Sequence, residues 1–486
     1  MKNKFVVTVV LSLMLSGLTP LTLNAQYEHV QSKIHNFIEN STTRTGLWSV
    51  SVRDTLGNHL LEINSDHLIR PASNTKLLTS AAILDGLGSD FTFRTYIYGD
   101  GILQDSTWIG DIHIAGSGDP SIDGEFYEDD PFFAFNSLID QIREFGINRI
   151  EGNLYGNESL FDDIPYPRGW EWDDLSYYYA PEISALSFNR NCVDLVVEAR
   201  GRAGDTPSIS WFPFDTDYVT FVNEQLITPA NIRFNESYRR ILGTNTILLR
   251  STLPAGHRDT ESLSVHDPAL YFIDTFRKQA EKKGVQWIGE LIPDRDLRNW
   301  DDFVVIGVHE SKPLGELIKR LNRNSDNFYT EMLTKALAAY SLKTEGTSET
   351  GIELIYNFLE DHQIPEERVR LRDASGMAGA NLLKTYDLSL FLQNMMKKSW
   401  FDAYLDSFAV AGDSGTLSHR FIGSPLQGNM QAKTGFVSGV RSLSGYMTTQ
   451  DGNTIIFSII TNNFVTRVAT VDRVHTSILE TLYREL

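Results

Sequence analysis

Hydrophobic and polar residues alternate in two segments near the start of the chain and in two near its end. The alternation predicts strands at residues 47–52 and 60–63 with a polar turn between them, which makes a hairpin. A second hairpin is predicted from residues 441–447 and 454–461, because Gln450-Asp451-Gly452-Asn453 between them is a strong turn sequence. Both ends of the chain are therefore expected to contribute antiparallel strands.

Apolar residues at helical spacing mark two further segments. Residues 72–84 are apolar on nearly every face, which is typical of a helix buried inside a protein. The last segment, residues 471–486, carries Val474, Ile478 and Leu482 at helical spacing. A membrane-surface helix would show the same apolar stripe, but this segment lacks a basic face, so a packed terminal helix is favoured.

Between the two ends the pattern changes. Short strand-like pieces, such as residues 108–114 and 193–198, are separated by Gly, Asp and Pro turns, and few helical patterns intervene. This pattern predicts a β-rich insertion over residues 93–299, built of two subdomains. The interrupted domain is then a discontinuous catalytic domain of residues 26–92 and 300–486, of mixed α/β content.

The first 25 residues are predicted to be a signal peptide. A short basic start with Lys2 and Lys4 precedes an apolar run over residues 5–18, and Leu23-Asn24-Ala25 offers a cleavage site. An N-terminal anchor is the alternative, but the run is short for a membrane span. We expect secretion through a cleaved signal peptide, with the periplasm as destination, and no later membrane span.

Charge and residue content narrow the class of protein. The 486 residues include 63 acidic and 43 basic side chains, a net charge of −20, which argues against partners such as nucleic acid or anionic lipid. Cys192 is the only cysteine, so no intramolecular disulfide is possible. The 11 histidines include no His-Glu-x-x-His and no pair four residues apart. A zinc peptidase is therefore disfavoured, and no metal or cofactor is predicted.

Three short motifs with catalytic potential occur in order along the chain. They are Ser73-Asn74-Thr75-Lys76, Ser325-Asp326-Asn327 and Lys433-Thr434-Gly435. Each motif is weak alone, and Ser187-Phe188-Asn189 repeats the second pattern by chance. Their value as evidence comes from the complete set, its order and its surroundings.

The first motif has the layout of a nucleophile and its base. Pro71-Ala72 leads into the apolar helix, so Ser73 is expected at a helix N-terminus, where negative charge on its hydroxyl oxygen is favoured. Lys76 follows on the same helix face. It accepts a proton only if burial or a nearby cation, such as Lys433, lowers its pKa. A helix cap at Ser73 with a surface lysine at Lys76 is the alternative, which the apolar helix disfavours.

The other two motifs also have a possible structural role. The second follows a polar turn and precedes a predicted helix from Phe328 onward, so Ser325 or Asp326 is a candidate helix cap. The third precedes Phe436-Val437 and is expected to start an edge strand, in which Gly435 permits the close approach of a ligand backbone.

Taken together, the motifs resemble those of the serine penicillin-recognising enzymes. Ser325 follows Ser73 by 252 residues and precedes Lys433 by 108. This spacing is similar to that of the low-molecular-mass class C penicillin-binding proteins of the D-alanyl-D-alanine carboxypeptidase/endopeptidase type, which carry domains inserted after the nucleophile helix. The resemblance extends to residues 169–174, 180–186, 373–376 and 411–417.

The resemblance implies a fold and a reaction. The fold is the β-lactamase and penicillin-binding-protein transpeptidase type, of α+β class, with an antiparallel sheet flanked by helices. Ser73 attacks the carbonyl of the penultimate D-alanine of a peptidoglycan peptide, with Lys76 as general base. Ser325 relays a proton to the leaving amine, and Asn327 orients Lys76 and the substrate amide. Water then hydrolyses the acyl-enzyme, and β-lactam antibiotics act as inhibitors.

Substrate contacts are implied in the same way. Lys433 and Thr434 meet the terminal carboxylate of the substrate, and the backbone N–H groups of Ser73 and of Phe436, which follows Gly435, hold the oxyanion. Asp174 attracts the free amino group of a diaminopimelate side chain, although surface solvation explains this residue equally well. Relatives commonly carry a small hydroxyl residue where this chain has Phe436. We therefore expect a preference for cross-linked peptides over carboxypeptidase substrates.

Two other functions share these motifs. A β-lactamase needs an additional base, and residues 353–357 imitate part of the loop that supplies it, but the surrounding pattern favours an amphipathic helix there. A non-catalytic wall-binding relative would keep the fold and lose the chemistry. The intact residues Ser73, Lys76, Ser325 and Lys433 argue against that reading. The sequence leaves the oligomeric state open.

Overall fold

The computed structural model describes residues 20–213 and 217–486, with side chains described from residue 26 onward. The predicted signal peptide, residues 1–25, therefore lies largely outside the described residues. None of the described helices is long and apolar enough to cross a membrane. The chain forms two compact units. The first unit comprises residues up to Asn74 together with 382–398 and 408–486, and the second comprises residues 75–381 and 399–407.

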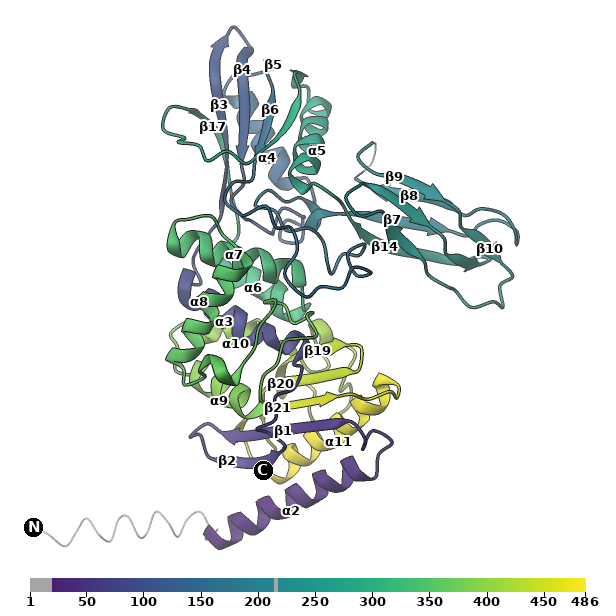
Figure 1. The fold of residues 1–486 in the computed structure, drawn as a ribbon, viewed down its shortest axis with the longest axis vertical. Helices are drawn as coiled ribbons and strands as arrows, with labels where there is room; N and C mark the ends of the chain where they lie inside the picture. Colours follow the sequence, from purple (N-terminus) through teal and green to yellow (C-terminus); the bar gives the residue numbers. More distant parts are fainter. Residues whose placement is uncertain (1–19, 214–216) are drawn as a thin grey trace, which may run out of the picture. The chain divides into compact units, whose positions relative to one another are not determined.

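The first unit is built on an antiparallel six-stranded sheet flanked by helices (Figure 1). Both predicted hairpins are confirmed, and the strand order β18-β19-β20-β21-β1-β2 places β1 beside β21, so the two ends of the chain share one sheet. The strands are β1 (Leu47–Asp54), β2 (His59–Ile63), β18 (Ala409–Val410), β19 (Met430–Val437), β20 (Val440–Thr448) and β21 (Thr454–Asn462). The helices are α2 (Pro20–Glu39), η1 (Ala72–Asn74), α9 (Thr385–Met395), η4 (Gly415–Leu417) and α11 (Val468–Glu485).

The alternation along β1 separates the two faces of this sheet. Val50 and Val52 are buried in the apolar cluster formed with α2 and α11, which lie along one face. Ser49 and Ser51 point the other way and form hydrogen bonds of 2.7 and 2.8 Å with hydroxyls of α9. Each fully buried valine contributes roughly 1.5–3 kcal/mol. Because successive residues of β1 point to opposite faces, their alternation determines which face of the sheet each helix covers.

The terminal helix α11 is packed as predicted. Ile478, Leu479 and Leu482 are fully buried in the same apolar cluster. Lys33 of α2 lies 2.7 Å from Glu485, which ties the two helices together beside the sheet. The apolar stripe of α11 thus faces the core of the first unit, and the membrane-surface alternative is wrong.

The second unit begins with the predicted buried helix. All residues of α3 from Thr75 to Leu84 are buried, because α3 is surrounded by other helices of the unit. These helices are α3 (Thr75–Leu87), α6 (Leu314–Arg323), α7 (Asn327–Leu342), α8 (Ser348–Asp361), η3 (Glu366–Arg368) and α10 (Phe401–Asp406). Residues 353–357 lie in the middle of α8, which confirms the predicted helix there and weakens the β-lactamase alternative.

Residues 93–310 are rich in strands, which agrees with the β-rich content predicted for residues 93–299. A seven-stranded sheet packs against two helices that the sequence patterns missed. Its elements are β3 (Arg94–Gln104), β4 (Thr107–Ala115), α4 (Phe133–Glu144), β5 (Arg149–Glu151), β6 (Leu154–Asn157), α5 (Pro268–Lys282), β15 (Gln286–Ile288), β16 (Leu291–Asp294) and β17 (Val304–Glu310). The predicted domain boundaries at residues 93 and 299 stay a prediction.

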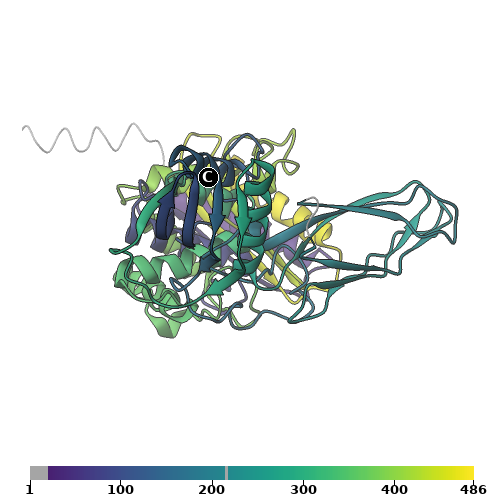
Figure 2. The ribbon, with the colours of Figure 1, turned by 90° about the horizontal axis from the view of Figure 1, so that it is seen from above.

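Three smaller sheets lie between β6 and α5 in the sequence. In Figures 1 and 2 the teal strands of this region form an elongated arm. The strand orders are β14-β7-β8, β11-β12-β9 and β10-β13. The elements are η2 (Asn189–Asn191), β7 (Cys192–Glu198), β8 (Ser208–Phe212), β9 (Thr220–Asn223), β10 (Leu226–Thr228), β11 (Tyr238–Arg240), β12 (Thr246–Leu249), β13 (Thr252–Pro254) and β14 (Arg258–Ser264).

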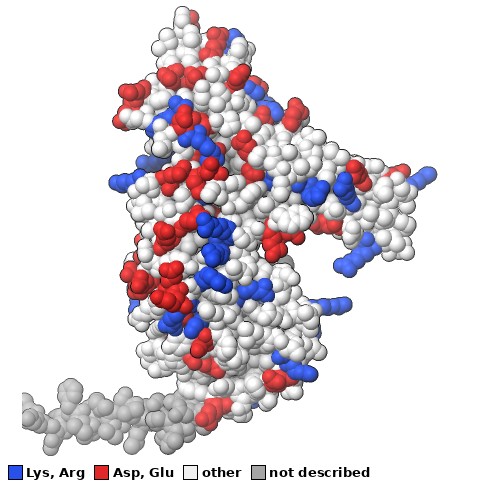
Figure 3. Space-filling model, viewed as in Figure 1, with Lys and Arg blue, Asp and Glu red and all other residues white. Residues whose placement is uncertain are grey.

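Acidic and basic side chains are interspersed on the face of the molecule shown in Figure 3. A continuous basic surface is what nucleic acid or an anionic membrane requires. The mixed pattern on the face shown is not of that kind.

Candidate active site

Ser73 lies in a strained turn near the end of the first chain segment of the first unit. The backbone of Ala72 has a φ of 49°, a left-handed conformation that is costly for a residue with a side chain. Ala72, Ser73 and Asn74 form the single turn η1, and the α-helix proper starts only at Thr75. The sequence pattern predicted a helix from residue 72, so the structure moves its first α-helical residue by three positions. Strain of this kind is concentrated at functional sites.

Hydrogen bonds hold this turn against the strands of the third motif. The Ser442 hydroxyl in β20 donates to the carbonyl of Pro71 at 2.7 Å. The Asn74 side chain donates to the carbonyl of Lys433 in β19 at 3.1 Å. Both bonds are buried. The first and third motifs, 359 residues apart along the chain at Asn74 and Lys433, are therefore brought together within the first unit.

Gly435 shows how close this approach is. A Cβ atom at this position would lie 3.0 Å from the Ser73 backbone nitrogen and 3.0 Å from the Pro71 carbonyl oxygen. It would also lie 2.2 Å from the Ser442 hydroxyl oxygen, which no real side chain tolerates. Glycine thus permits the close approach of the turn that carries Ser73, and the predicted approach of a ligand backbone stays a prediction.

The third motif lies inside β19 rather than at its start. The strand begins at Met430, and its pairing with β18 covers Gln431 and Ala432, the two residues before the motif. The predicted start of the strand is thus wrong by three residues. The predicted edge is correct for the segment that carries the motif.

The side chains of this segment differ in exposure. Lys433 is fully buried, and its ammonium group donates to the Thr434 carbonyl at 2.8 Å. The Thr434 hydroxyl donates to the Thr416 hydroxyl at 2.7 Å. Phe436 is 54% exposed, and its backbone lies at the edge of the sheet. Thr416 lies in residues 411–417, one of the segments that resemble the penicillin-binding proteins, but the three motifs did not assign it a role.

Lys76 lies in the second unit, where it is fully buried in α3. Its ammonium nitrogen lies 2.6 Å from the Asn327 side-chain oxygen and 2.7 Å from the Ser375 carbonyl oxygen. Burial lowers the pKa of Lys76 to about 8, although Asp373, Glu331 and Asp326 oppose the shift. Burial is thus the main cause of the lowered pKa. A lysine with this pKa has a neutral fraction near neutral pH and can accept a proton.

The second motif joins α6 to α7. Ser325 has a φ of 61°, a second left-handed residue in the candidate site. Asp326 is the N-cap of α7, because its side chain accepts from the Tyr329 backbone nitrogen at 3.1 Å. Its other oxygen accepts from Arg320 at 3.0 Å. Helix capping, the alternative for this motif, is therefore the role of Asp326, which leaves Ser325 and Asn327 on either side of the cap.

Asn327 also links the second motif to Asp174. Its side-chain nitrogen donates to the Tyr179 carbonyl at 2.8 Å, and the Tyr179 hydroxyl donates to Asp174 at 3.1 Å. Partial burial raises the pKa of Asp174. Asp174 therefore has a defined partner, which bare surface solvation would not give it. The sequence did not predict a role for Tyr179, because nothing distinguishes it from the two tyrosines that precede it.

A loop over residues 373–377 completes the surroundings of Lys76. The Asp373 carboxylate accepts from the Ser375 hydroxyl at 2.7 Å, from the Gly376 nitrogen at 3.1 Å and from the Trp170 indole at 2.9 Å. Asp373 is fully buried. It thus fixes the loop whose Ser375 carbonyl binds Lys76. The sequence offered Asp373-Ala374-Ser375-Gly376 only as part of the resemblance.

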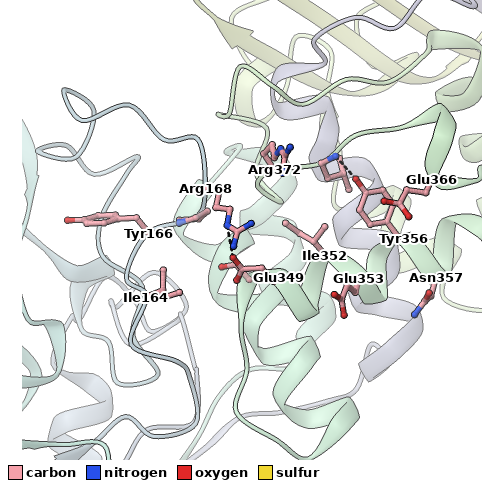
Figure 4. A pocket seen from close by; sticks show the side chains of 13 residues that line it. Ile164, Tyr166, Arg168, Glu349, Ile352, Glu353, Tyr356, Asn357, Glu366 and Arg372 are labelled. Atoms are coloured by element: carbon pink, nitrogen blue, oxygen red, sulfur yellow. Dashed lines mark hydrogen bonds and ion pairs between the residues drawn. The ribbon is translucent and has the colours of Figure 1, made fainter.

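A cavity of about 360 Å³ in the second unit is separate from these residues. Arg168 and Glu349 form an ion pair of 2.9 Å among its lining residues, which also include Ile352 of α8 (Figure 4). None of the motif residues lines this cavity. Because the motif residues lie elsewhere, this cavity is not the candidate reaction centre, despite its size.

Comparison with known families settles the class of the protein. The model of the D-Ala-D-Ala carboxypeptidase 3 (S13) family matches residues 30–480. The chain belongs to this S13 peptidase family. As an S13 peptidase it is a serine hydrolase of the D-Ala-D-Ala carboxypeptidase type, as the three motifs predicted.

Individual relatives extend the S13 match. A D-alanyl-D-alanine carboxypeptidase of Actinomadura sp. (strain R39) is 27% identical over 457 residues, which are 90% of this chain and 82% of the relative. The crystal structure of penicillin-binding protein 4 (DacB) from Haemophilus influenzae has a TM-score of 0.82 at 22% identity and covers 93% of this chain and 99% of its own. Bd3459, a predatory peptidoglycan endopeptidase from Bdellovibrio bacteriovorus, has a TM-score of 0.51 at 15% identity and covers 90% and 93%. The fold of this S13 peptidase is therefore that of the penicillin-binding proteins, as predicted.

Proposed function

We propose that this S13 peptidase cleaves D-alanyl bonds of peptidoglycan stem peptides or cross-links through an acyl-enzyme on Ser73. The observation that carries the proposal is the surroundings of Lys76. Three residues after Ser73, this lysine is fully buried, has a lowered pKa and is held by Asn327 of the second motif. Burying a lysine costs folding free energy, so its retention fits a group that must exchange a proton.

In the proposed acylation step, the Ser73 hydroxyl passes its proton to the neutral amine of Lys76. The Ser73 oxygen attacks the carbonyl carbon of the penultimate D-alanine. The negative charge that forms on the carbonyl oxygen is held by the N–H groups of Ser73 and Phe436. The approach of Gly435 to the Ser73 nitrogen supports this pairing, because it brings the two backbone segments together.

Collapse of the tetrahedral intermediate breaks the carbon–nitrogen bond. In our proposal Ser325 relays the proton from Lys76 to the leaving amine, and Asn327 keeps Lys76 and the substrate amide in line. An ester on Ser73 remains. Water attacks this ester with Lys76 again as base, which releases the peptide and restores the Ser73 hydroxyl.

The third motif provides the proposed contact to the carboxylate of the substrate. Lys433 supplies the charge and Thr434 a hydroxyl, which donates to Thr416 at 2.7 Å and would turn its proton to the carboxylate when substrate binds. Phe436 lacks the hydroxyl that relatives commonly add at this position, so the grip on a free terminal carboxylate is weaker. This favours bulkier groups beyond the scissile bond. We propose that cross-linked peptides are preferred, which makes endopeptidase activity dominant over carboxypeptidase activity.

The preference is measured as the ratio of kcat/KM for a cross-linked dimer to that for a monomeric pentapeptide. We expect a ratio above one for the wild type and a lower ratio for Phe436→Thr, because the new hydroxyl contacts the free carboxylate. Faster trimming of the monomer by the wild type contradicts the preference.

Asp174 is proposed to attract the free amino group of a diaminopimelate side chain in the substrate. Its carboxylate is half-buried and is oriented by Tyr179, whose carbonyl in turn holds Asn327. Recognition of the substrate side chain and positioning of Lys76 thus share one short chain of hydrogen bonds. The surrounding residues Glu171 and Asp173 add negative charge that favours a cation.

We also propose that the chain is exported and cleaved after Ala25, with the periplasm as its destination. The basic start, the apolar run and the small residue before Gln26 support cleavage. Intact-mass analysis of the protein purified from the periplasm of a Gram-negative host is the test. A mature chain that begins at Gln26 is the expected result, and an uncleaved cell-bound chain contradicts it.

The test of the acyl-enzyme is intact-mass analysis after incubation with benzylpenicillin. A stable adduct of the whole drug mass is expected on the wild type and not on Ser73→Ala. Ser418→Ala, in another turn of the first unit, is the control and should be acylated like the wild type. An unmodified wild type with the drug intact contradicts the proposal. Drug destroyed without an adduct points instead to a β-lactamase.

A further inference from the structure

A buried glutamate that the proposed mechanism does not use lies beside Lys76. Glu331 is in α7, four residues after Asn327 and hence on the same helix face. Its side chain is fully buried. Its Oε1 atom accepts from the backbone nitrogens of Ala374 at 3.1 Å and Ser375 at 2.8 Å. Its Oε2 atom is buried and accepts no hydrogen bond from any residue in the described part of the chain.

The peptide segment that Glu331 binds is the one that holds Lys76. The N–H groups of Ala374 and Ser375 point to Glu331, and their carbonyl oxygens point to α3. The Ser375 carbonyl accepts from Lys76 at 2.7 Å, and the Ala374 carbonyl accepts from the Thr79 hydroxyl at 2.8 Å. Two residues of loop thus connect the carboxylate on α7 to the ammonium group on α3.

A purely structural role does not require a carboxylate at this position. A glutamine oxygen would accept the same two backbone hydrogen bonds without the cost of burying a charge. The unused Oε2 atom increases that cost. Burial and the negative charge of Asp373 raise the pKa of Glu331, whereas the positive charge of Lys76 opposes this shift and favours the ionised carboxylate when the lysine is protonated. A carboxylate retained under these conditions indicates a use for its charge.

The chemistry of Lys76 supplies such a use. When Lys76 accepts the Ser73 proton it becomes an ammonium ion in a buried site, where an uncompensated charge is costly. Glu331 is one of three carboxylates that favour the charged form of Lys76, with Asp373 from the loop and Asp326 at the start of α7. Asp373 and Asp326 are committed to hydrogen bonds of the loop and of the helix cap. Glu331 alone of the three has a buried oxygen without a donor.

We propose that Glu331 is a positioning residue for the general base. It orients Lys76 through the Ser375 peptide, and its charge stabilises the ammonium form that Lys76 takes up during acylation. This inference rests on the proposed role of Lys76 as the base for Ser73. It adds a residue that touches neither substrate nor nucleophile.

The test is the pH dependence of acylation by benzylpenicillin in Glu331→Gln. The amide keeps the acceptor for Ala374 and Ser375 and removes the charge. We expect the midpoint of the rising limb to move down by about one pH unit, because the ammonium form of Lys76 loses a stabilising charge. We also expect the plateau rate to fall, because a weaker base drives proton transfer less well. Glu353→Gln, an exposed position of α8, is the matched control and should behave like the wild type.

Glu331→Ala separates orientation from charge, because it removes the backbone acceptor as well. We expect its acylation rate to fall further than that of Glu331→Gln, with circular dichroism confirming a folded protein. If Glu331→Ala does not fold, Glu331→Gln still decides the matter. An unchanged midpoint in Glu331→Gln, with or without a lower rate, overturns the inference while the wild-type adduct stands. A wild type that forms no adduct overturns the proposed function and this inference together.

Discussion

The ammonium group of Lys76 donates a 2.7 Å hydrogen bond to the carbonyl oxygen of Ser375, a residue 299 positions further along the chain. This bond and the 2.6 Å bond to Asn327 fix the lysine in a site from which water is excluded. The same burial that makes Lys76 difficult to charge makes it a base near neutral pH. The geometry of Lys76 therefore leads directly to measurable properties of the enzyme.

The first prediction concerns the pH dependence of acylation. The neutral form of Lys76 is the proposed base, and its pKa is lowered to about 8. Below this value the acylation rate should rise about tenfold per pH unit, and above it the rate should level off. Stopped-flow measurement of benzylpenicillin acylation in the wild type checks this. A flat profile below the midpoint contradicts Lys76 as the titrating base.

How much of Lys76's surroundings is readable from the sequence depends on the kind of contact. The expectation that Ser73 and Lys76 share a helix face came from their spacing of three residues, and it stays a prediction because Ser73 lies in the turn before α3. The burial of Lys76 follows from the apolar helix around it. The Ser375 contact does not follow, because a backbone carbonyl carries no residue-specific signal. Glu331 carried a weak signal, since it lies one helical turn after Asn327, but a glutamate in a helix is more often exposed to solvent.

The same distinction holds for the fold. The hairpins were predicted because alternation and polar turns, with Asp451-Gly452 in the second hairpin, act locally. The left-handed Ala72 was not, because an alanine gives no sign of that conformation and the surrounding strands impose it. Helix α5 was missed although Asp267-Pro268 is a helix-start signal, with Asp267 capping the helix and proline at its first position. The short strand-like segments on either side led to a β-rich prediction for the whole region, so this helix was not predicted.

The second prediction uses Asn327 to raise the pKa of Lys76. In Asn327→Asp a carboxylate replaces the amide oxygen that lies 2.6 Å from the lysine nitrogen. A negative charge at this distance stabilises the ammonium form, so the midpoint of acylation should move up by at least about one pH unit. At neutral pH the rate should fall by about tenfold or more. The measurement is the acylation rate against pH.

Asn324→Asp is the control for this substitution, because it adds the same charge at an exposed position of the same turn. Its midpoint should match that of the wild type. An unshifted midpoint in Asn327→Asp, with a folded protein, would show that Asn327 does not contact the titrating base.

The third prediction tests the contact between β19 and the turn that carries Ser73. In Gly435→Ala the new methyl group would meet the Ser442 hydroxyl at 2.2 Å and the Ser73 nitrogen at 3.0 Å. The turn must shift to make room, which misplaces the nucleophile. We expect acylation to slow by about 100-fold or more and the melting temperature to fall. Gly379→Ala is the control, because a methyl group there meets no atom within 4 Å. Equal acylation rates in the two variants would contradict this account of Gly435.

The last prediction concerns the side-chain specificity proposed for Asp174. The wild type should prefer a pentapeptide with a free diaminopimelate amino group over the same peptide with that group acetylated. In Asp174→Asn the ratio of the two kcat/KM values should fall to about one. The loss corresponds to at most about 1 kcal/mol, the upper end for a partly exposed charge pair, or up to roughly fivefold in kcat/KM.

Asp173→Asn is the matched control for Asp174, because Asp173 is the exposed neighbouring carboxylate. It changes the local charge equally but has no hydrogen bond to Tyr179 in the described structure. If both variants lose the preference equally, general negative charge rather than the oriented Asp174 carboxylate attracts the amino group. Penicillin has no diaminopimelate side chain, so its acylation rate should stay near the wild-type value in both variants. A large loss of penicillin acylation in Asp174→Asn would instead mean that Asp174 acts through Tyr179 on Asn327 and Lys76.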